Sequence, residues 1–308
     1  MRALVTGCAG FIGSSLTDRL LRDGYEVIGI DRFSDYYPRD LKERNLSSAV
    51  KHPRFTLLEK DILDMKSFPS VDYVFHLAAQ AGVRASWGEN FEVYTRDNIL
   101  ATQRLLEFYK SRKIRKFVYS SSSSVYDDAE LPMREDRMVQ LVSPYGVTKL
   151  AAEHLYYLYW KNYGVPTVSL RYFTVYGPRQ RPDMGINRFV RAVLKGEAIT
   201  VYGDGTQTRD FTYIDDVVEA NILAAESDVR GEVFNIGGGN RISVNDLIGA
   251  IEEVTGKGAT VEHAGEQKGD VKDTRADTQK AEELLGWHAR TGIAAGLERY
   301  VDWIREEP

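Results

Sequence analysis

The chain has 308 residues, of which 43% are hydrophobic and 28% are charged. This balance is ordinary for a globular protein of one large domain or two unequal ones, and a disordered chain is not what it predicts. The net charge of -5 argues against nucleic acid as a partner. Cys8 is the only cysteine, which excludes an intramolecular disulfide and a cysteine-based metal site, and no metal site is predicted. We expect a cytoplasmic protein without a membrane-spanning segment, because no apolar run reaches the necessary length.

Short β-rich runs alternate with longer helical patterns up to about residue 170. This alternation is typical of βαβ units around a parallel sheet. Each run is continuous and apolar, as expected of a strand that is covered on both faces. The predicted strands are residues 3–6, 26–30, 55–58, 73–77, 116–120 and 167–170. The predicted helices between them are residues 11–22, about 99–109 and about 143–163.

The regular alternation ends after Tyr172, where loops rich in Gly, Pro and Arg appear. Further helices are predicted at about residues 186–194, 215–225, 244–254, 276–285 and 292–304. The predicted fold class is α/β, with a Rossmann-type doubly wound parallel sheet in residues 1–172. Part of the later chain is expected to return to that sheet. Residues 173–308 are expected to form mainly a smaller C-terminal α/β domain that binds the substrate.

A glycine-rich turn joins the first predicted strand to the first predicted helix. Gly7, Gly10 and Gly13, with Phe11 and Ile12, let backbone N–H groups and a helix N-terminus face a pyrophosphate without an intervening side chain. Glycine spacing by itself is weak evidence, and the alternative is a tight strand-to-helix turn without a ligand. The strand and the amphipathic helix on either side favour a dinucleotide site.

The second predicted strand ends at Asp31, where a carboxylate can accept hydrogen bonds from both adenosine ribose hydroxyls. Because this acid disfavours a 2′-phosphate, we predict NAD rather than NADP, although Arg32 could in principle contact such a phosphate. Other residues at strand ends lie where a cofactor crevice is expected, or else are ordinary core and turn residues. The remaining predicted cofactor-binding residues are Asp61, Ile62, Leu77, Ala78, Ala79, Asn98, Tyr145, Lys149 and Tyr172.

Tyr145 and Lys149 are four residues apart in a predicted helix, so their side chains lie on one face, one turn apart. A nearby ammonium and a nicotinium charge are expected to lower the pKa of the tyrosine, which is otherwise a poor base at neutral pH. The serine run 120–124 follows a predicted strand and can place a hydroxyl beside the reacting group of a ligand. Taken separately, the pair is usually a surface feature and the serine run a solvated loop. Together they favour a catalytic group.

With these motifs in place, the chain resembles an extended short-chain dehydrogenase/reductase of the nucleotide-sugar epimerase and dehydratase family. The resemblance covers nearly the whole chain. The matching segments are residues 6–13, 76–79, 122–126, 145–149, 171–173 and 175–178. One departure is Asp127, where the family often has Gly, and it puts only the conformation of that loop in doubt.

The resemblance implies that Tyr145 removes the 4-hydroxyl proton of a sugar while NAD takes the C4 hydride, giving a 4-keto intermediate. Ser122, Tyr145 and Lys149 would be the catalytic group. Dehydratases of the family usually carry Asp-Glu next to the catalytic hydroxyl, and decarboxylases commonly keep the Glu. Ser123 and Ser124 occupy those positions here. The reaction that remains is epimerisation.

The later segments resemble the parts of the family that hold the nucleotide and the sugar. Arg188 and Arg209 would neutralise the pyrophosphate, and Asp270 would accept a hydrogen bond from the nucleotide ribose. The alternative for each arginine is a solvated side chain. The predicted substrate-binding residues are Arg84, Ser123, Ser124, Thr174, Arg181, Asn187, Arg188, Val201, Tyr202, Arg209 and Asp270.

Residues 82–88 and 173–184 look most like those of bacterial UDP-glucuronate 4-epimerases. Thr174 stands where galactose-type enzymes usually carry Asn, so that this residue with Arg84 and Arg181 could accommodate a C6 carboxylate. These arginines could equally contact phosphate or each other. UDP-glucuronate and UDP-galacturonate are therefore slightly preferred, and the alternative is a UDP-glucose/UDP-galactose or N-acetylhexosamine 4-epimerase. A non-catalytic NAD-binding relative is opposed by the intact Ser, Tyr and Lys.

Helices around residues 96–109 and 145–163 resemble those that form a four-helix homodimer interface in this family. Tyr156, Tyr157, Tyr159 and Trp160 would supply its apolar surface, or would instead belong to the core of the chain. The sequence leaves both open.

Overall fold

The computed structural model describes residues 1–126, 130–137, 139, 141–265 and 271–307. Within this part of the chain, seven strands form one sheet in the order β10-β6-β5-β4-β1-β2-β3, and every neighbouring pair is parallel. The strands are β1 Arg2–Thr6, β2 Glu26–Asp31, β3 Phe55–Glu59, β4 Tyr73–His76, β5 Lys116–Ser122, β6 Thr167–Tyr172 and β10 Glu232–Ile236. The predicted Rossmann-type α/β class is confirmed.

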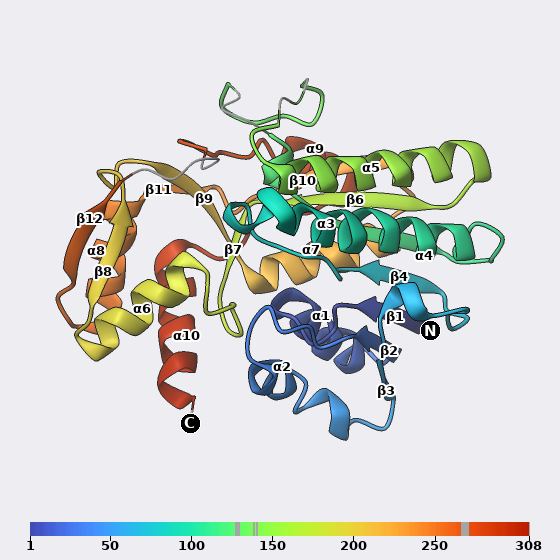
Figure 1. The fold of residues 1–308 in the computed structure, drawn as a ribbon, viewed down its shortest axis with the longest axis horizontal. Coiled ribbons are helices and arrows are strands. Elements are labelled where there is room, and N and C mark those ends of the chain that lie inside the picture. The colour runs from blue at the N-terminus through green and yellow to red at the C-terminus, as the bar shows by residue number, and fades with distance from the viewer. Residues whose placement is uncertain (127–129, 138, 140, 266–270, 308) are drawn as a thin grey trace.

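Helices cover both faces of this sheet (Figure 1). Successive side chains of a strand point to opposite faces. Ala3 and Val5 accordingly pack with α1 (Phe11–Arg22) and α7 (Ile214–Glu226), whereas Leu4 packs with α4 (Ala101–Tyr109) and α5 (Pro144–Tyr163). Burial on both sides explains why the strands read as continuous apolar runs.

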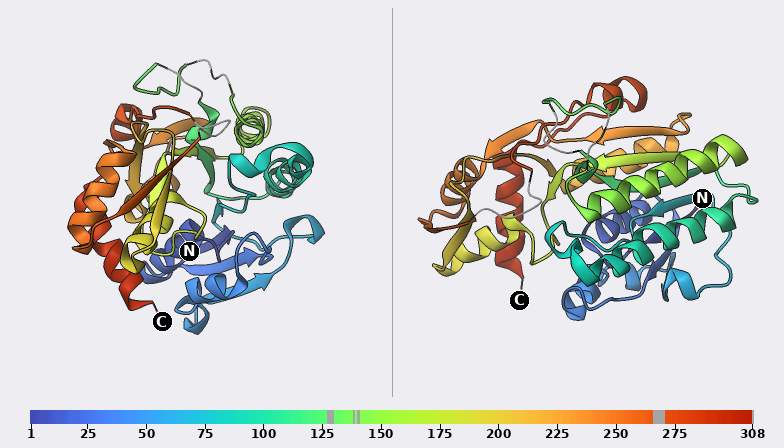
Figure 2. Two further views of the ribbon diagram at one scale, coloured as in Figure 1. Left: turned by 60° about the vertical axis from the view of Figure 1, so that its left-hand side comes forward. Right: turned by 45° about the horizontal axis from the view of Figure 1, so that its top comes forward.

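The rest of the later chain forms smaller layers beside the large sheet (Figure 2). Among the described residues, β7 (Thr174–Tyr176), β9 (Thr208–Tyr213) and β11 (Asn240–Ser243) form one small sheet, and β8 (Ala198–Tyr202) pairs with β12 (Thr260–Ala264). The helices of this part are α6 Gly185–Lys195, α8 Val244–Thr255, α9 Gln279–Leu285 and α10 Ile293–Glu306. By contrast, β10 is an edge strand of the large sheet, and α7 packs on one face of that sheet.

Helix α5 has clear signals at both ends. The Ser143 side chain caps it by accepting a hydrogen bond from the Gly146 N–H at 3.1 Å, and Pro144 occupies the first position. Gly164 ends the helix with a φ of 71°, the left-handed conformation that glycine adopts without strain. The cap fixes the first turns of α5, where Tyr145 and Lys149 lie.

The helix predicted over residues 99–109 begins earlier and is irregular. It consists of α3 (Phe91–Tyr94), a π-helical stretch η5 (Thr95–Leu100) and α4. A π-helical turn contains one residue more per hydrogen-bonded ring than an α-helix and therefore changes which side chains face inward. Here it turns Asn98 into the interior, where 1% of the residue is exposed.

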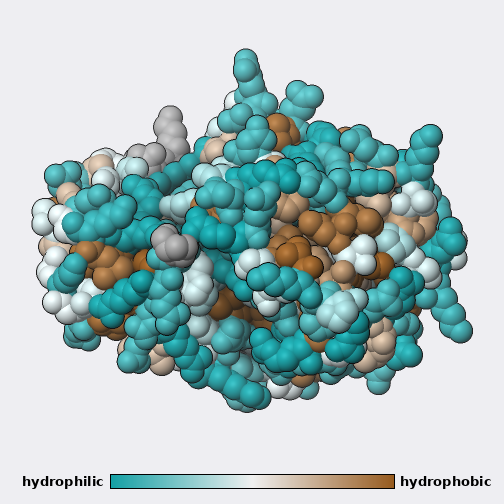
Figure 3. All heavy atoms as spheres, turned by 90° about the horizontal axis from the view of Figure 1, so that it is seen from below, coloured by the Kyte–Doolittle hydropathy of each residue, from teal (hydrophilic) through white to brown (hydrophobic). Residues whose placement is uncertain are grey.

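The surface seen from below is largely hydrophilic, with small patches of hydrophobic residues between polar ones (Figure 3). Among the helices in the described ranges, none is both long enough and apolar enough to cross a membrane.

Three short helical segments lie between β2 and β4 along the described chain: α2 (Arg39–Asn45), η1 (Ala49–Lys51) and η2 (Ile62–Asp64).

Candidate active site

A cavity of about 240 Å³ lies at the carboxyl ends of the strands of the large sheet. Ligands bind at this edge in open parallel sheets, because the loops that follow the strands meet there. All the predicted cofactor-binding residues except Asn98 line it: Gly7, Gly10, Phe11, Ile12, Gly13, Asp31, Arg32, Asp61, Ile62, Leu77, Ala78, Ala79, Tyr145, Lys149 and Tyr172. Arg181, predicted as a substrate residue, lines the same cavity.

The glycine turn that follows β1 lies very close to the start of helix α1 and to the loop after β4. Gly7 has a φ of 71°, and a Cβ atom on it would lie 2.8 Å from the backbone nitrogen of Ala78. A Cβ atom on Gly13 would lie 2.1 Å from the carbonyl oxygen of Gly7. No side chain caps the N-terminus of α1 at Gly10. This cradle fits the pyrophosphate of a dinucleotide, which needs bare backbone N–H groups at a helix N-terminus.

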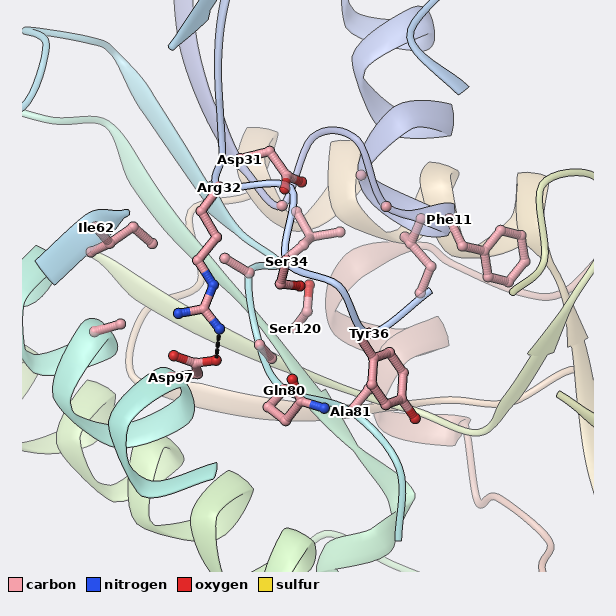
Figure 4. Close-up of a pocket in the computed structure, with 18 of the residues that line it drawn as sticks. Phe11, Asp31, Arg32, Ser34, Tyr36, Ile62, Gln80, Ala81, Asp97 and Ser120 are labelled. Carbon is pink, nitrogen blue, oxygen red and sulfur yellow. Dashed lines mark hydrogen bonds and ion pairs between the residues drawn. The ribbon is translucent and has the colours of Figure 1, made fainter. Parts of the chain in front are cut away.

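Asp31 lies at the end of β2, next to the glycine turn. Its carboxylate accepts hydrogen bonds from the backbone N–H groups of Ala9 at 3.0 Å and Phe33 at 2.8 Å. The neighbouring Arg32 reaches away from the turn, with ion pairs to Asp61 at 2.9 Å and to Asp97 at 2.5 Å (Figure 4). Asp31 is therefore fixed where ribose hydroxyls are expected, and the Arg32 guanidinium is engaged elsewhere.

Lys149 is almost fully buried, with 3% of the residue exposed. Its Nζ donates to the carbonyl oxygen of Ser120 at 2.5 Å and lies 4.4 Å from the centre of the Tyr119 ring. Burial lowers the pKa of Lys149 to about 7, against the opposing effect of the Glu153 charge. The side chain thus titrates near neutral pH instead of carrying a permanent charge.

Tyr145 lies one turn before Lys149. Burial raises the pKa of its phenol, whereas a hydrogen bond with Ser122 and the positive charge of Arg181 lower it. The expected effect of the neighbouring ammonium on this pKa stays a prediction. The Lys149 Nζ donates to the Ser120 carbonyl oxygen, and Arg181 adds a second cation that acts on Tyr145.

The serine run is held against the start of α5. Ser122 Oγ accepts a hydrogen bond from the Ser124 N–H and donates to Ser124 Oγ, both at 3.1 Å. A Cβ atom on Gly146 would lie 2.2 Å from the Ser124 carbonyl oxygen, so only glycine allows this approach. The backbone N–H of Tyr145 donates to Ser86 Oγ at 3.1 Å. These contacts bring the predicted catalytic hydroxyls together.

Arg181 comes to the cavity from the loop between β7 and α6. Its Nε and Nη2 donate to the two carboxylate oxygens of Asp183 at 3.0 and 3.1 Å. Its guanidinium lies 5.6 Å from the centre of the Tyr36 ring, and the Tyr36 hydroxyl donates to Asp183 at 3.3 Å. Tyr36 enters the same cavity from the loop after β2 (Figure 4). A bidentate partner on one edge leaves the Nη1 edge of Arg181 to face a second anion.

Asn98 does not line the cavity. Its amide donates to the Gln80 carbonyl at 3.0 Å and to Thr148 Oγ1 at 2.9 Å, and its oxygen accepts from the Gln80 N–H at 2.8 Å. It thereby ties the loop after β4 to α5. Asn98 thus connects two walls of the cavity, and its predicted contact with the cofactor stays a prediction.

Most other predicted substrate residues lie away from this cavity. Arg84 stacks on Tyr202 at 4.4 Å and so joins the loop after β4 to β8. Arg209 donates to the carbonyl oxygens of Thr208 and Lys272 at 2.9 and 2.8 Å.

The remaining predicted substrate residues differ in burial. Asn187 donates to the Gln180 carbonyl and the Tyr300 hydroxyl, both at 2.8 Å, and Val201 is buried, with 1% of the residue exposed. Arg188 is exposed on α6 and Thr174 is half-buried on β7. Asp270, like Asp127, lies outside the described residues.

The model of the NAD dependent epimerase/dehydratase family matches residues 3–237. An uncharacterized UDP-glucose epimerase of Bacillus subtilis is 43% identical, covering 99% of this chain and 98% of the relative. A UDP-glucuronate 4-epimerase of Thermodesulfobacterium geofontis is also 43% identical, covering 98% of this chain and 96% of the relative. The chain belongs to the NAD dependent epimerase/dehydratase family.

The structure of a UDP-glucuronic acid 4-epimerase from Bacillus cereus, in complex with UDP-glucuronic acid and NAD, has the same fold. Its TM-score is 0.96 at 45% identity, and the match covers 99% of each chain. The resemblance noted in the motifs is thus confirmed, and so is NAD as the cofactor of the family.

Several residues of the cavity were not identified from the sequence. They are Ile30, Ser34, Tyr36, Tyr37, Lys42, Lys60, Gln80, Ala81, Asp97 and Ala101. The rule that loops after parallel strands meet at the ligand edge would have indicated residues 33–37, which directly follow β2. Asp97 had no such signal, because it faces the cavity from a helix that the sequence does not mark as irregular.

Proposed function

We propose that this chain catalyses NAD-dependent C4 epimerisation of a UDP-hexose through a 4-keto intermediate, with UDP-glucuronate and UDP-galacturonate preferred. The observation that carries the proposal is a single cavity in which the glycine turn, the Tyr145 and Lys149 pair and Arg181 meet. It is supported by relatives named as UDP-glucuronate 4-epimerases that match the chain over almost its whole length.

In this proposal the residues of the catalytic group have separate roles. Tyr145 takes the proton of the 4-hydroxyl, Ser122 hydrogen-bonds the same oxygen, and Lys149 supplies a donor that titrates near neutral pH. NAD, when bound in the cradle, would accept the C4 hydride and return it. Ser123 and Ser124 stand where dehydratases and decarboxylases need carboxylates, which leaves epimerisation as the favoured outcome.

We further propose that residues 1–172 hold mainly the cofactor, and that residues 173–308 hold mainly the UDP-sugar. The proposed ligands of the UDP-sugar are Arg84, Ser123, Ser124, Thr174, Arg181, Asn187, Arg188, Val201, Tyr202, Arg209 and Asp270. The stacking of Arg84 on Tyr202 supports a site between the two parts, since it joins the loop after β4 to β8.

Arg181 carries the preference for a uronate. Its guanidinium has a second edge for a carboxylate while Asp183 occupies the first, and it acts electrostatically on Tyr145, so it lies at the reacting end of the cavity. The ion pair between Arg181 and Asp183 also favours the alternative, a UDP-glucose/UDP-galactose epimerase. Because Asp183 already balances the charge of Arg181, a neutral sugar would not face an uncompensated cation.

Incubating the protein with UDP-glucuronate, UDP-glucose and UDP-N-acetylglucosamine separately, and separating the products, tests the proposal. Epimers of the uronate are expected as main product. Arg181→Leu is expected to reduce uronate turnover about 100-fold and UDP-glucose turnover by clearly less, because both sugars lose the cation near Tyr145 but only the uronate also loses the partner of its carboxylate. Tyr145→Phe is expected to remove turnover of every sugar. Exclusive turnover of neutral sugars would refute the uronate preference, and a stable 4-keto product or carbon dioxide would refute epimerisation.

A cytoplasmic homodimer is also proposed. Leu100, Tyr157 and Leu158 are 52%, 47% and 49% exposed, which supports an apolar patch next to α4 and on α5, whereas Tyr156 and Tyr159 belong to the core. Light scattering after gel filtration is expected to give the mass of a dimer. Leu158→Glu should then give a folded monomer.

A further inference from the structure

Arg32 belongs to a closed ring of ion pairs at the edge of the proposed cofactor site. Its Nη1 and Nη2 atoms pair with Asp61 at 2.9 Å and with Asp97 at 2.5 Å. Arg96 pairs with the same two carboxylates, at 2.7 Å with Asp61 and at 2.8 Å with Asp97. These four residues are called the ion-pair ring below. With two cations and two anions, it has no net charge.

The ring is held on several sides. Asp61 also caps η2, where its second oxygen accepts a hydrogen bond from the Leu63 N–H at 2.9 Å. Asp97 lies in the π-helical stretch η5, next to Asn98, whose amide is fixed by three hydrogen bonds. The carboxylate side chains are 15% and 13% exposed. Both carboxylates are therefore held in place and would not follow Arg32 if its side chain moved away from them.

The position of Arg32 makes this ring relevant to the choice of cofactor. It directly follows Asp31, and an arginine near that acid accommodates the 2′-phosphate of NADP in folds of this type. In Figure 4 its side chain runs from the end of β2 to Asp97 instead. To bind a 2′-phosphate it would have to leave both carboxylates, which would then have only Arg96 to balance them.

We propose that Asp97, acting with Asp61, withholds Arg32 from the ribose 2′ position and is a determinant of selectivity for NAD over NADP, in addition to Asp31. This inference rests on the proposed function, since it assumes that the cavity binds the dinucleotide. It predicts that removing Asp31 alone does not give a good NADP site. The arginine needed for the 2′-phosphate stays in the ion-pair ring until Asp97 loses its charge.

The test measures NAD and NADP affinities by titration calorimetry on protein freed of bound nucleotide, in an Asp31→Asn background. Adding Asp97→Asn is expected to tighten NADP binding about tenfold relative to Asp31→Asn alone. Adding Arg96→Gln instead is the matched control, because it changes the ring by one charge but leaves Arg32 with both carboxylates, and it should give no gain. Adding Arg32→Gln to the Asp31→Asn, Asp97→Asn protein should abolish the gain.

No gain from Asp97→Asn, or a gain that survives Arg32→Gln, would overturn the inference. If Asp31→Asn leaves NAD binding unchanged, the cofactor site itself is misplaced, and that result is separate from a failure of the ring alone. Thermal unfolding of each variant checks that it folds. Asp97→Asn in the otherwise natural chain provides a second measurement, with NADP binding about threefold tighter expected while Asp31 still opposes the phosphate.

Discussion

Gly13→Ala gives the most direct test of the cofactor cradle. A Cβ atom on residue 13 would lie 2.1 Å from the Gly7 oxygen, 2.8 Å from the Gly7 carbonyl carbon and 3.1 Å from Cys8 Cα. All three are backbone atoms, so no side chain can rotate away. Since real Cβ atoms essentially never approach closer than 3.0 Å, the start of α1 must move away from the glycine turn by roughly 0.9 Å, the difference between 3.0 and 2.1 Å.

A forced separation of this kind costs about 1–3 kcal/mol in a packed interior. It also shifts the N–H groups at the start of α1, so we expect NAD affinity to fall at least about tenfold together with the stability. Urea unfolding and NAD titration of the same protein measure both effects.

Gly249→Ala in α8 is the matched control, because no atom outside its own helix lies within 4 Å of the added Cβ. It should stabilise the chain by about 0.5–1 kcal/mol, as alanine does inside helices. The reasoning would be refuted if Gly13→Ala bound NAD as the natural chain does and unfolded at the same urea concentration.

Two further predictions concern buried charge. Glu153→Gln leaves the Arg171 guanidinium, with 6% of its side chain exposed, without its carboxylate, so urea unfolding should show a loss of about 3–5 kcal/mol. Glu232→Gln, which breaks the more exposed pair with Lys280, should cost less than about 1 kcal/mol, and equal losses would contradict the argument. Burial lowers the pKa of His76 to about 3, and the charge of Lys149 is a second, smaller cause. Below pH ~6.5 the imidazole therefore binds a proton in the unfolded chain but not in the folded chain. Stability should therefore fall as pH drops from about 6.5 towards 3, by up to ~1.4 kcal/mol per unit from this group, and His76→Gln should make the slope shallower; an unchanged slope would exclude His76 as the cause.

The large sheet could be predicted because its signals are local. The side chains of Ala3, Leu4 and Val5 are buried on alternating faces of the sheet. A strand that is buried on both faces is a continuous apolar run in the sequence, and such a run between amphipathic helices predicts a strand of a parallel sheet. The small sheets gave no such signal. Strand β8 pairs with β12, about sixty residues later, and Val261 in β12 is 36% exposed, so its side chains do not form an apolar run.

The residues of the candidate site also divide into those with a local signal in the sequence and those without one. Asp31, Tyr145 and Lys149 could be predicted because each stands at a fixed distance from a glycine turn, a strand or another site residue along the chain. The partners of Arg32 could not, since Asp61 and Asp97 follow it by 29 and 65 residues and meet only when strand ends and a helix converge. A sequence identifies residues that carry chemistry more readily than it identifies the residues that hold them.

Arg181 links the choice of sugar to the proton transfer. Its positive charge lowers the pKa of the Tyr145 phenol, against the opposite effect of burial, and Asp183 holds Arg181 by one edge of its guanidinium. A sugar carboxylate on the open edge of Arg181 would offset part of that positive charge, which favours the protonated phenol. We therefore expect the pH dependence of turnover to differ between a uronate and a neutral sugar, because only the uronate changes the charge next to Tyr145.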